Sequence, residues 1–386
     1  MKYTEYKLYE THKILTNHSN LSVMKKFMYL AVLAGVALVG CTKNERTTEL
    51  IDSQKEISFT TPVLSTVTKA EPINANTFPT TLSFNVFAWY STDPFNGSNA
   101  ESTLYMNDVA VSHTDRNDAT TGDAGAWEPA QPYYWPKNGK LTFDAYYPAA
   151  VNATPDQAKG IQVASFTATT DNGTQVDFLY SERVYDKVSS IENTNNTYDG
   201  VDIPFKHALS VVAIKVKALD DPAAGAIRVK EVKLHQISNE GKFDENITVN
   251  NPYTASPKWT VGSGAKVDYT AKTAVDYASS QVLTTSPAAF GGEMIVLPQT
   301  FHGTSVDSPN ATIEVEYYIN NPDNKPHLQK YTFDLTSDYS DDSSIPVTAW
   351  KMGNRYTYTL TFTVDAIYFA PSITVWDEVH ITVPQI

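Results

Sequence analysis

The 386-residue chain is predicted to be all-β and built from β-sandwich domains, on three observations. Charged residues make up only 19% of the chain, and tyrosine, with 23 residues, and threonine are abundant, a composition that favours strands. Several segments alternate apolar and polar residues. Asn-Gly and Gly-Gly pairs punctuate the chain between them, as turns do.

The alternation is clearest in residues 355–364, which read RYTYTLTFTV. Tyr356, Tyr358 and Leu360 fall on one face of this segment, and threonines fall on the other. A period of two residues predicts a strand with one buried face. The same pattern occurs in residues 82–88, 141–147, 212–216 and 313–319. No long segment after Cys41 has helical spacing.

The front of the chain has the pattern of an export signal. Lys25 and Lys26 precede an uncharged run from Phe27 to Gly40. Fourteen residues at a rise of ~1.5 Å span only ~21 Å, which is short of the ~30 Å hydrocarbon core of a bilayer. We therefore expect a signal in residues 1–40 rather than a stable transmembrane helix, with translation starting at Met24.

Cys41 is the only cysteine in the chain and directly follows this run. The residues Leu-Val-Gly-Cys resemble the bacterial lipobox, in which the cysteine is acylated and becomes the first residue of the mature protein. We expect Cys41 to carry a lipid that holds the chain at the outer membrane or cell surface. The alternative is a buried cysteine in an ordinary signal or core segment. Without a second cysteine, no disulfide is possible within the chain.

The remaining residues suggest two domains. Residues 186–200 are polar, lack periodicity and precede the strong strand pattern of residues 201–218. We expect a boundary near residue 198, which gives domains at 41–198 and 199–386. The alternative is that residues 186–200 are a long hairpin loop.

The sequence offers no constellation for catalysis. No His-Glu-x-x-His, Gly-x-Ser-x-Gly or phosphate-loop motif occurs, and the acidic runs match no calcium-loop spacing. We therefore expect no enzyme activity, no cofactor and no metal. The formal net charge of −14 argues against a nucleic-acid partner.

Clustered aromatic residues are the one candidate for ligand contact. Tyr133, Tyr134 and Trp135 could form a platform on which sugar rings stack. The neighbouring residues 141–147 are an alternating strand, so these rings could equally pack in the core.

An ordered set of segments then resembles one known family. After the lipobox come KEISFTTPV, YYWPKNGKLTFDAYYP, VDFLYS, FKHALSVVAIKVKA, MIVLPQ, AWKMGNRYTYTLTF and ITVWDEVHITV. This order is similar to that of the fimbrillins, the type V pilins, from about Cys41 to Ile386. The resemblance implies two tandem transthyretin-like β-sandwich domains after a lipoprotein signal peptide. It also implies that a trypsin-like protease removes a first strand and that a strand from another pilin subunit replaces it.

The first strand is expected at residues 56–64, with Ile57, Phe59 and Val63 on one face. The polar stretch that follows contains Lys69, so the resemblance places the cleavage site at Lys69-Ala70. Arg46 is the rival, but a cut there leaves the strand attached. The alternative for Lys69 is an ordinary exposed lysine.

The last stretch is the candidate donor strand, in which apolar residues share one face: Ile373, Val375, Val379, Ile381 and Val383. A terminal strand of this kind can add to an open sheet edge. The alternative is that it pairs within its own domain.

The resulting hypothesis is a structural or accessory subunit of a cell-surface fimbria that supports adhesion. Its expected partners are other pilin subunits, the outer membrane through a lipid on the precursor, and a maturation protease. The alternative function is a surface glycan-binding lipoprotein that uses Tyr133, Tyr134 and Trp135.

Overall fold

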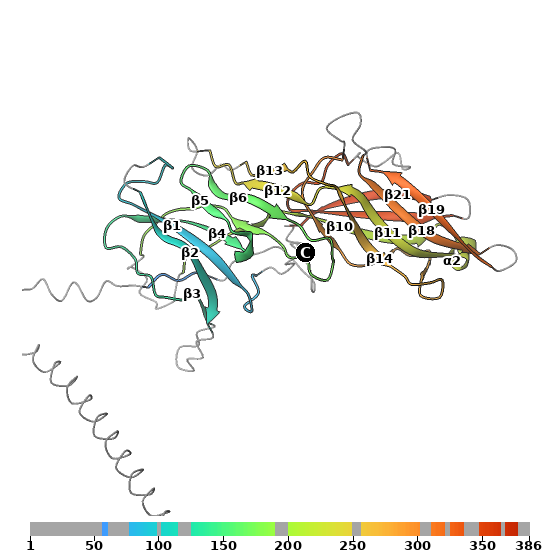
Figure 1. The fold of residues 1–386 in the computed structure, drawn as a ribbon. Coiled ribbons are helices and arrows are strands. Elements are labelled where there is room, and N and C mark those ends of the chain that lie inside the picture. Colours follow the sequence, from blue (N-terminus) through green and yellow to red (C-terminus); the bar gives the residue numbers. More distant parts are fainter. Residues whose placement is uncertain are drawn as a thin grey trace, which may run out of the picture. The chain divides into compact units, whose positions relative to one another are not determined.

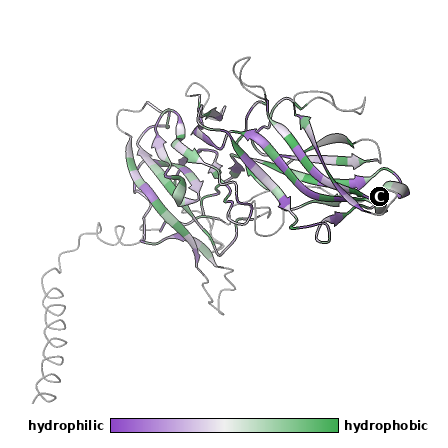
Figure 2. Cartoon of the chain, turned by 45° about the vertical axis from the view of Figure 1, so that its right-hand side comes forward, coloured by the Kyte–Doolittle hydropathy of each residue, from purple (hydrophilic) through white to green (hydrophobic). Residues whose placement is uncertain are grey.

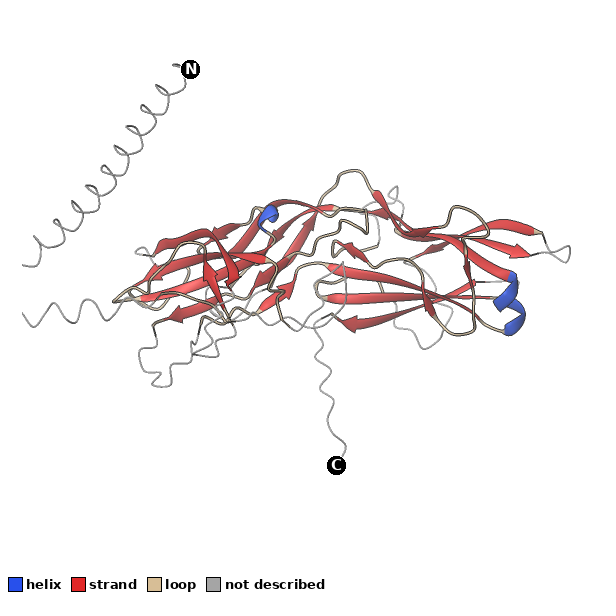
Figure 3. Cartoon of the chain, turned by 90° about the horizontal axis from the view of Figure 1, so that it is seen from below, coloured by secondary structure: helices blue, strands red, loops and turns tan. Residues whose placement is uncertain are grey.

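The computed structural model describes residues 56–60, 77–98, 102–114, 125–189, 200–248, 256–301, 310–320, 325–335, 347–363 and 367–376. Strands dominate this part of the chain (Figures 1 and 3), so the all-β prediction is confirmed. The helical elements among these residues are a 3₁₀ turn, η1 (Ala149–Val151), and a six-residue helix, α2 (Asp221–Ala226). Residues from Lys55 onward form one compact unit.

The first sheet has seven strands and is antiparallel. Six of them follow the order β3 (Ala126–Pro129), β2 (Thr103–Thr114), β1 (Ser83–Ser91), β4 (Lys140–Tyr147), β7 (Leu179–Ser181) and β9 (Phe205–His207). The seventh, β8 (Val184–Lys187), also pairs with β4. The edges of this sheet are therefore β3 and β9.

The second sheet has four strands, in the order β13 (Lys258–Val261), β12 (Glu240–Asp244), β6 (Gly160–Thr167) and β5 (Thr154–Asp156). It joins segments that lie far apart in the sequence, because β12 pairs with β6.

The last two sheets are built from later strands. The third sheet has the order β16 (Ala288–Ala289), β10 (Ser210–Ala218), β20 (Asn354–Phe362) and β21 (Ile367–Val375), and β17 (Met294–Val296) also pairs with β10. The fourth has the order β14 (Val267–Thr273), β11 (Ile227–Ile237), β18 (Thr312–Asn320) and β19 (Pro326–Asp334), with β15 (Gln281–Val282) on β11. Only the β10–β20 pair is parallel among the pairings of the described strands.

Three hydrophobic cores hold these sheets. The first core lies on one face of the first sheet and includes Phe84, Trp127 and Phe143. The second core lies on the other face, between the first and second sheets, and includes Tyr146, Phe178 and Phe243. The third core fills the space between the third and fourth sheets. The first sheet is therefore covered on both faces over much of β1 and β4.

The predicted strand faces are confirmed. Phe84, Val86 and Ala88 of β1 all enter the first core. The apolar faces of β10, β18 and β20 all enter the third core. Figure 2 shows hydrophobic and hydrophilic residues alternating along strands of the sheets. The predicted turn at Asn138-Gly139 is also present, since Gly139 has a φ of +86°, a conformation that favours glycine.

The domain boundary near residue 198 stays a prediction, and strand pairing crosses that point twice. β9 pairs back with β7 in the first sheet, and β12 pairs back with β6 in the second. Sequence polarity marked a break between segments, but it carries no information about which earlier strand a later one joins.

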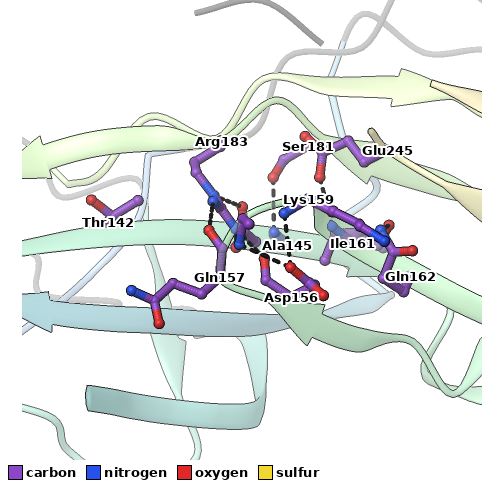
Figure 4. Close-up of polar contacts among 12 residues, drawn as sticks. Thr142, Ala145, Asp156, Gln157, Lys159, Ile161, Gln162, Ser181, Arg183 and Glu245 are labelled. Atoms are coloured by element: carbon purple, nitrogen blue, oxygen red, sulfur yellow. Dashed lines mark hydrogen bonds and ion pairs between the residues drawn. The ribbon is translucent and has the colours of Figure 1, made fainter. Parts of the chain in front are cut away.

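A buried ion pair links the first sheet to the second (Figure 4). The Arg183 guanidinium donates two hydrogen bonds to the Asp144 carboxylate of β4, each 2.8 Å long. It also donates to the carbonyl oxygen of Gln157, in the turn after β5, at 2.7 Å, and to that of Asp156, the last residue of β5, at 2.9 Å. Burial alone would lower the pKa of Arg183, but the Asp144 carboxylate raises it, so the guanidinium stays charged.

Glu245, which follows β12, lies buried beside this pair. Its Oε2 accepts a 2.7 Å hydrogen bond from the Ile161 amide. Burial, and then repulsion by Asp144, raise the pKa of Glu245 well above its usual value. The folded chain therefore favours the protonated form of this carboxyl group.

This preference predicts a pH dependence of stability. Above the unfolded pKa of ~4.3, the unfolded chain releases the Glu245 proton and the folded chain keeps it, so the free energy of unfolding falls by about 1.4 kcal/mol per pH unit until the folded pKa is reached. Glu245→Gln removes this slope. We expect the variant to match the wild type near pH 4 and to be more stable at pH 7, in urea unfolding followed across pH.

Glu240→Gln is the control, since it removes an exposed carboxylate from β12, the strand that precedes Glu245. Parallel pH profiles for the wild type and Glu245→Gln would contradict the prediction.

Candidate functional site

Residues 56–60, here called the ribbon, join the two edges of the first sheet. On one side, the amides of Ile57 and Phe59 donate to the carbonyl oxygens of Tyr133 and Trp127, at 2.7 and 2.9 Å. Trp127 belongs to the edge strand β3. These bonds attach the ribbon to the first edge of the sheet.

On its other side, the ribbon pairs with the chain that leads into β9, at the opposite edge. The Thr60 amide donates to the Val201 carbonyl oxygen at 3.0 Å, and the Val201 amide donates to the Ser58 carbonyl oxygen at 2.8 Å. Phe59 thus forms an antiparallel bridge with Trp127 and a parallel bridge with Val201. The ribbon closes the first sheet around the first core.

The side chains of Ile57 and Phe59 fill the inside of this closed sheet. They are 1% and 3% exposed. The Phe59 ring meets Phe84 and Phe143 edge-to-face, with centroids 5.9 and 5.8 Å apart. Burying two such side chains contributes ~1.5–3 kcal/mol each. The segment therefore has the packing of a core strand.

Gly200 allows the ribbon backbone to come close. A Cβ atom on Gly200 would lie 2.4 Å from the Phe59 carbonyl carbon and 2.6 Å from the Thr60 nitrogen. Any side chain at position 200 would push the ribbon away from Val201. This glycine is needed for close approach of two backbones, the role that glycine often has in sheets.

The first core also contains a cluster of aromatic rings around Phe78, which contacts no ring of the ribbon. Phe78 is 1% exposed and contacts Phe84, Trp127, Tyr147 and Phe205, with centroids 5.3–5.6 Å apart. Phe78 lies on the far side of Lys69 in the sequence, so a cut at Lys69 leaves Phe78 attached to the body of the chain.

Several predicted site residues lie outside the described residues. These are Cys41, Arg46, Val63, Lys69, Ala70, Val379, Ile381 and Val383. Of the predicted first strand, the structure describes residues 56–60, and it places Ile57 and Phe59 together in the first core.

The start of the candidate donor strand lies in the third sheet. β21 pairs with β20 from Ile367 to Val375, as the alternative interpretation expects. Ile373 is 48% exposed, and Trp376 is buried in the second core, stacked on His207 with centroids 3.7 Å apart. Donation by residues 373–375 would require β21 to leave β20.

The predicted aromatic platform faces the core in part. Tyr133 and Trp135 pack against the first core, and the Trp135 ring contacts Phe143 at 6.0 Å. The Tyr134 hydroxyl lies 3.5 Å from Glu56 Oε1, at the start of the ribbon. These contacts fit the core-packing alternative, and Tyr133 and Tyr134 also contact the ribbon directly.

Sequence reasoning missed Trp127, Phe78, Gly200 and Val201 as partners of the ribbon. The glycine at the end of the polar stretch 186–200 was a usable signal, because glycine directly before a strand can mark close backbone contact. The pairing itself joins residues 141 positions apart, which local periodicity does not reveal.

Among the residues that the structure describes, no three His, Cys, Asp or Glu side chains are grouped so as to hold a metal ion. Over the same ranges, no helix has the length and apolar character needed to cross a membrane.

A family model described as fimbrillin-like matches residues 68–376. The chain belongs to the fimbrillin-like family. The match covers the first-sheet strands, all three remaining sheets and the chain up to Trp376. Members of this family are structural proteins, and this fimbrillin-like chain is not an enzyme.

A comparison with solved structures finds similar chains, and the first of the two described here shares the fold. A fimbrial protein from Bacteroides vulgatus is 17% identical, with a TM-score of 0.57, over 83% of this chain and 99% of that one. The tip fimbrial protein Mfa3 from Porphyromonas gingivalis, with a C-terminal truncation, is 8% identical, with a TM-score of 0.32, over 76% and 94% of the two chains. No curated protein matches the sequence.

The packing of the ribbon predicts the effect of Phe59→Ala. Loss of a buried ring from a closed sheet should lower the free energy of unfolding by ~3–5 kcal/mol, because a cavity opens beside Phe84 and Phe143. Urea unfolding measures this, and hydrogen exchange at the Val201 amide should accelerate. Tyr331→Ala, which removes a 49% exposed ring from β19, is the control. Equal losses for the two variants would contradict this account of the ribbon.

Proposed function

We propose that the chain is a subunit of a cell-surface fimbria, assembled by removal of the ribbon and its replacement by a strand from another subunit. The observation that carries this proposal is that the ribbon closes the first sheet with backbone hydrogen bonds on both sides. Any extended peptide with suitable side chains could make the same backbone bonds.

Loss of the ribbon would leave a groove with defined chemistry. The carbonyl oxygens of Tyr133, Trp127 and Val201 and the amide of Val201 would lose their partners. The sockets of Ile57 and Phe59 would open above Phe84 and Phe143. Unpaired edges and exposed apolar sockets favour the uptake of a strand, since a new strand restores the backbone bonds and buries apolar surface again.

The cut that frees the ribbon is proposed at Lys69-Ala70, by a trypsin-like protease. Lys69 lies between the ribbon and Phe78 in the sequence, so cleavage there separates the ribbon from the rest of the chain. Cleavage at Arg46 would leave the ribbon attached. Before the cut, a lipid on Cys41 is proposed to hold the precursor at the outer membrane, and adhesion is the proposed output of the finished fimbria.

The proposed partners are other pilin subunits. Residues 379–383 of this chain stay the candidate donor segment toward a neighbour, since Val379, Ile381 and Val383 alternate with polar residues. The packing of Tyr133 and Trp135 against the first core favours a structural role for these rings over glycan binding.

Strand exchange is tested with a labelled peptide of residues 55–62. After limited trypsin digestion, with the cut mapped by mass spectrometry, we expect the peptide to bind the Lys69-cut protein in fluorescence anisotropy. The uncut protein and the Lys69→Ala variant should bind much less, because their ribbon stays tethered beside the groove. Protein cut at Arg46 alone is the matched control. A Lys69-cut protein that never takes up the peptide would argue against exchange.

The anchor is tested by Cys41→Ser in cells that export lipoproteins. The variant lacks the thiol that receives the lipid, and stable anchoring needs acyl chains, so it should move from the membrane fraction to the soluble fraction. Retention of the variant in the membrane fraction would rule out a lipid on Cys41 as the anchor.

A further inference from the structure

We propose that the groove selects a strand with a large apolar residue, a small residue, an aromatic residue and a residue with a backbone N–H, in that order. Residues 379–386 of this chain do not meet this requirement, so the natural occupant is a strand from a different kind of subunit. This inference rests on the proposed strand exchange and specifies the partner.

The third position demands an aromatic ring. Phe59 is 3% exposed and has two edge-to-face partners, Phe84 and Phe143, which are both fully buried. These partners are fixed from other directions, since Phe84 also contacts Phe78, Trp127 and Phe205. A socket whose walls are held in this way does not collapse around a smaller side chain, and a valine or isoleucine there leaves a cavity.

The second position demands a small side chain. Successive residues of an extended strand point to opposite faces, so Ser58 points away from Ile57 and Phe59. Ser58 is nevertheless only 4% exposed. The ribbon is thus covered on its outer face at this point, and the space there suits serine and not a large side chain.

The fourth position demands an amide hydrogen. The Thr60 amide donates to the Val201 carbonyl oxygen at 3.0 Å. Gly200 packs against the same stretch of backbone, which holds the two chains at hydrogen-bonding distance. Proline has no amide hydrogen and would leave the Val201 oxygen without this bond.

The end of this chain does not meet these requirements when it is aligned with residues 57–60 in the same chain direction. With Ile381 in the place of Ile57, Val383 enters the ring socket and Pro384 takes the position of Thr60. With Val379 in that place, His380 replaces the buried Ser58 and Ile381 enters the ring socket. Residues 377–386 contain no Phe, Tyr or Trp, so no alignment of this stretch fills the socket with an aromatic ring.

Trp376 does not supply the missing ring. It is 2% exposed in the second core, stacked on His207, and its amide donates to the Gly353 carbonyl oxygen at 2.6 Å. The preceding residues of β21 are paired with β20. The aromatic residue of the incoming strand therefore does not come from the C-terminal segment of a second copy of this chain.

The first test grafts the tail sequence onto the ribbon in the full chain, where no cleavage is needed. One variant carries Ser58→Thr, Phe59→Val and Thr60→Pro, and the other carries Ile57→Val, Ser58→His and Phe59→Ile. Ile57→Leu is the control that keeps the required order. We expect hydrogen exchange at the Val201 amide to accelerate at least about tenfold in both grafts and to change little in the control.

Exchange in β10 and β18 serves as an internal reference, because the third core lies away from the ribbon. If both grafts protect Val201 as well as the wild type does, the selectivity proposal is overturned, and strand exchange is untouched.

The second test uses Lys69-cut protein and two labelled peptides, residues 55–62 and residues 378–386. The first peptide should bind at least about tenfold more tightly, and the cut protein alone should stay monomeric on native gels. Equal binding, or a ladder formed by the cut protein alone, would overturn the selectivity. Failure of both peptides to bind would overturn strand exchange itself, and this inference with it.

Discussion

The first sheet depends on one constraint, which is that a sheet covered on both faces must also have its edges satisfied. Its inner face encloses the first core, and its outer face lies on the second core. Both edges, at β3 and at the chain leading into β9, face the same gap. Five residues, Glu56 to Thr60, close that gap by pairing with both edges. A closed sheet has no free edge for a wrong partner to join, so the ribbon protects the sheet as well as completing it.

The side chains of the ribbon contribute to the first core, and the second and third cores contain no residue of the ribbon. The second core holds the same sheet from behind, through residues such as Tyr146 and Phe178, and Arg183 fastens β4 to the β5–β6 turn. Neither of these supports includes a residue of the ribbon. The sheet that would receive a new strand is thus held in place by contacts that a cut at Lys69 does not touch.

The sequence was sufficient for the parts of the fold that follow from local periodicity. Alternation placed Phe84, Val86 and Ala88 on one buried face, and it identified Ile57 and Phe59 as inward-facing residues. It did not reveal that Phe87, on the opposite face of the same strand, is also buried, because that depends on a second sheet contributed by later segments. Asp144 and Arg183 are residue types that usually lie at the surface. Only their pairing with each other explains why both are buried. The sequence could not predict the partners of the ribbon for the same reason, because Trp127 and Val201 pair with it across a long stretch of chain.

The free energy of ribbon docking explains how the ribbon can stay bound and still be replaced by another strand. Two buried apolar side chains and four backbone hydrogen bonds contribute about 5–12 kcal/mol in total. Ordering five residues of backbone costs about 5–10 kcal/mol. The favourable total offsets this cost, and the tether adds stability by keeping the ribbon at a high effective concentration. A cut at Lys69 removes the contribution of the tether but none of the four backbone hydrogen bonds of the ribbon. A competing strand then needs only a slightly better fit, or a high local concentration of its own, to take the ribbon's place.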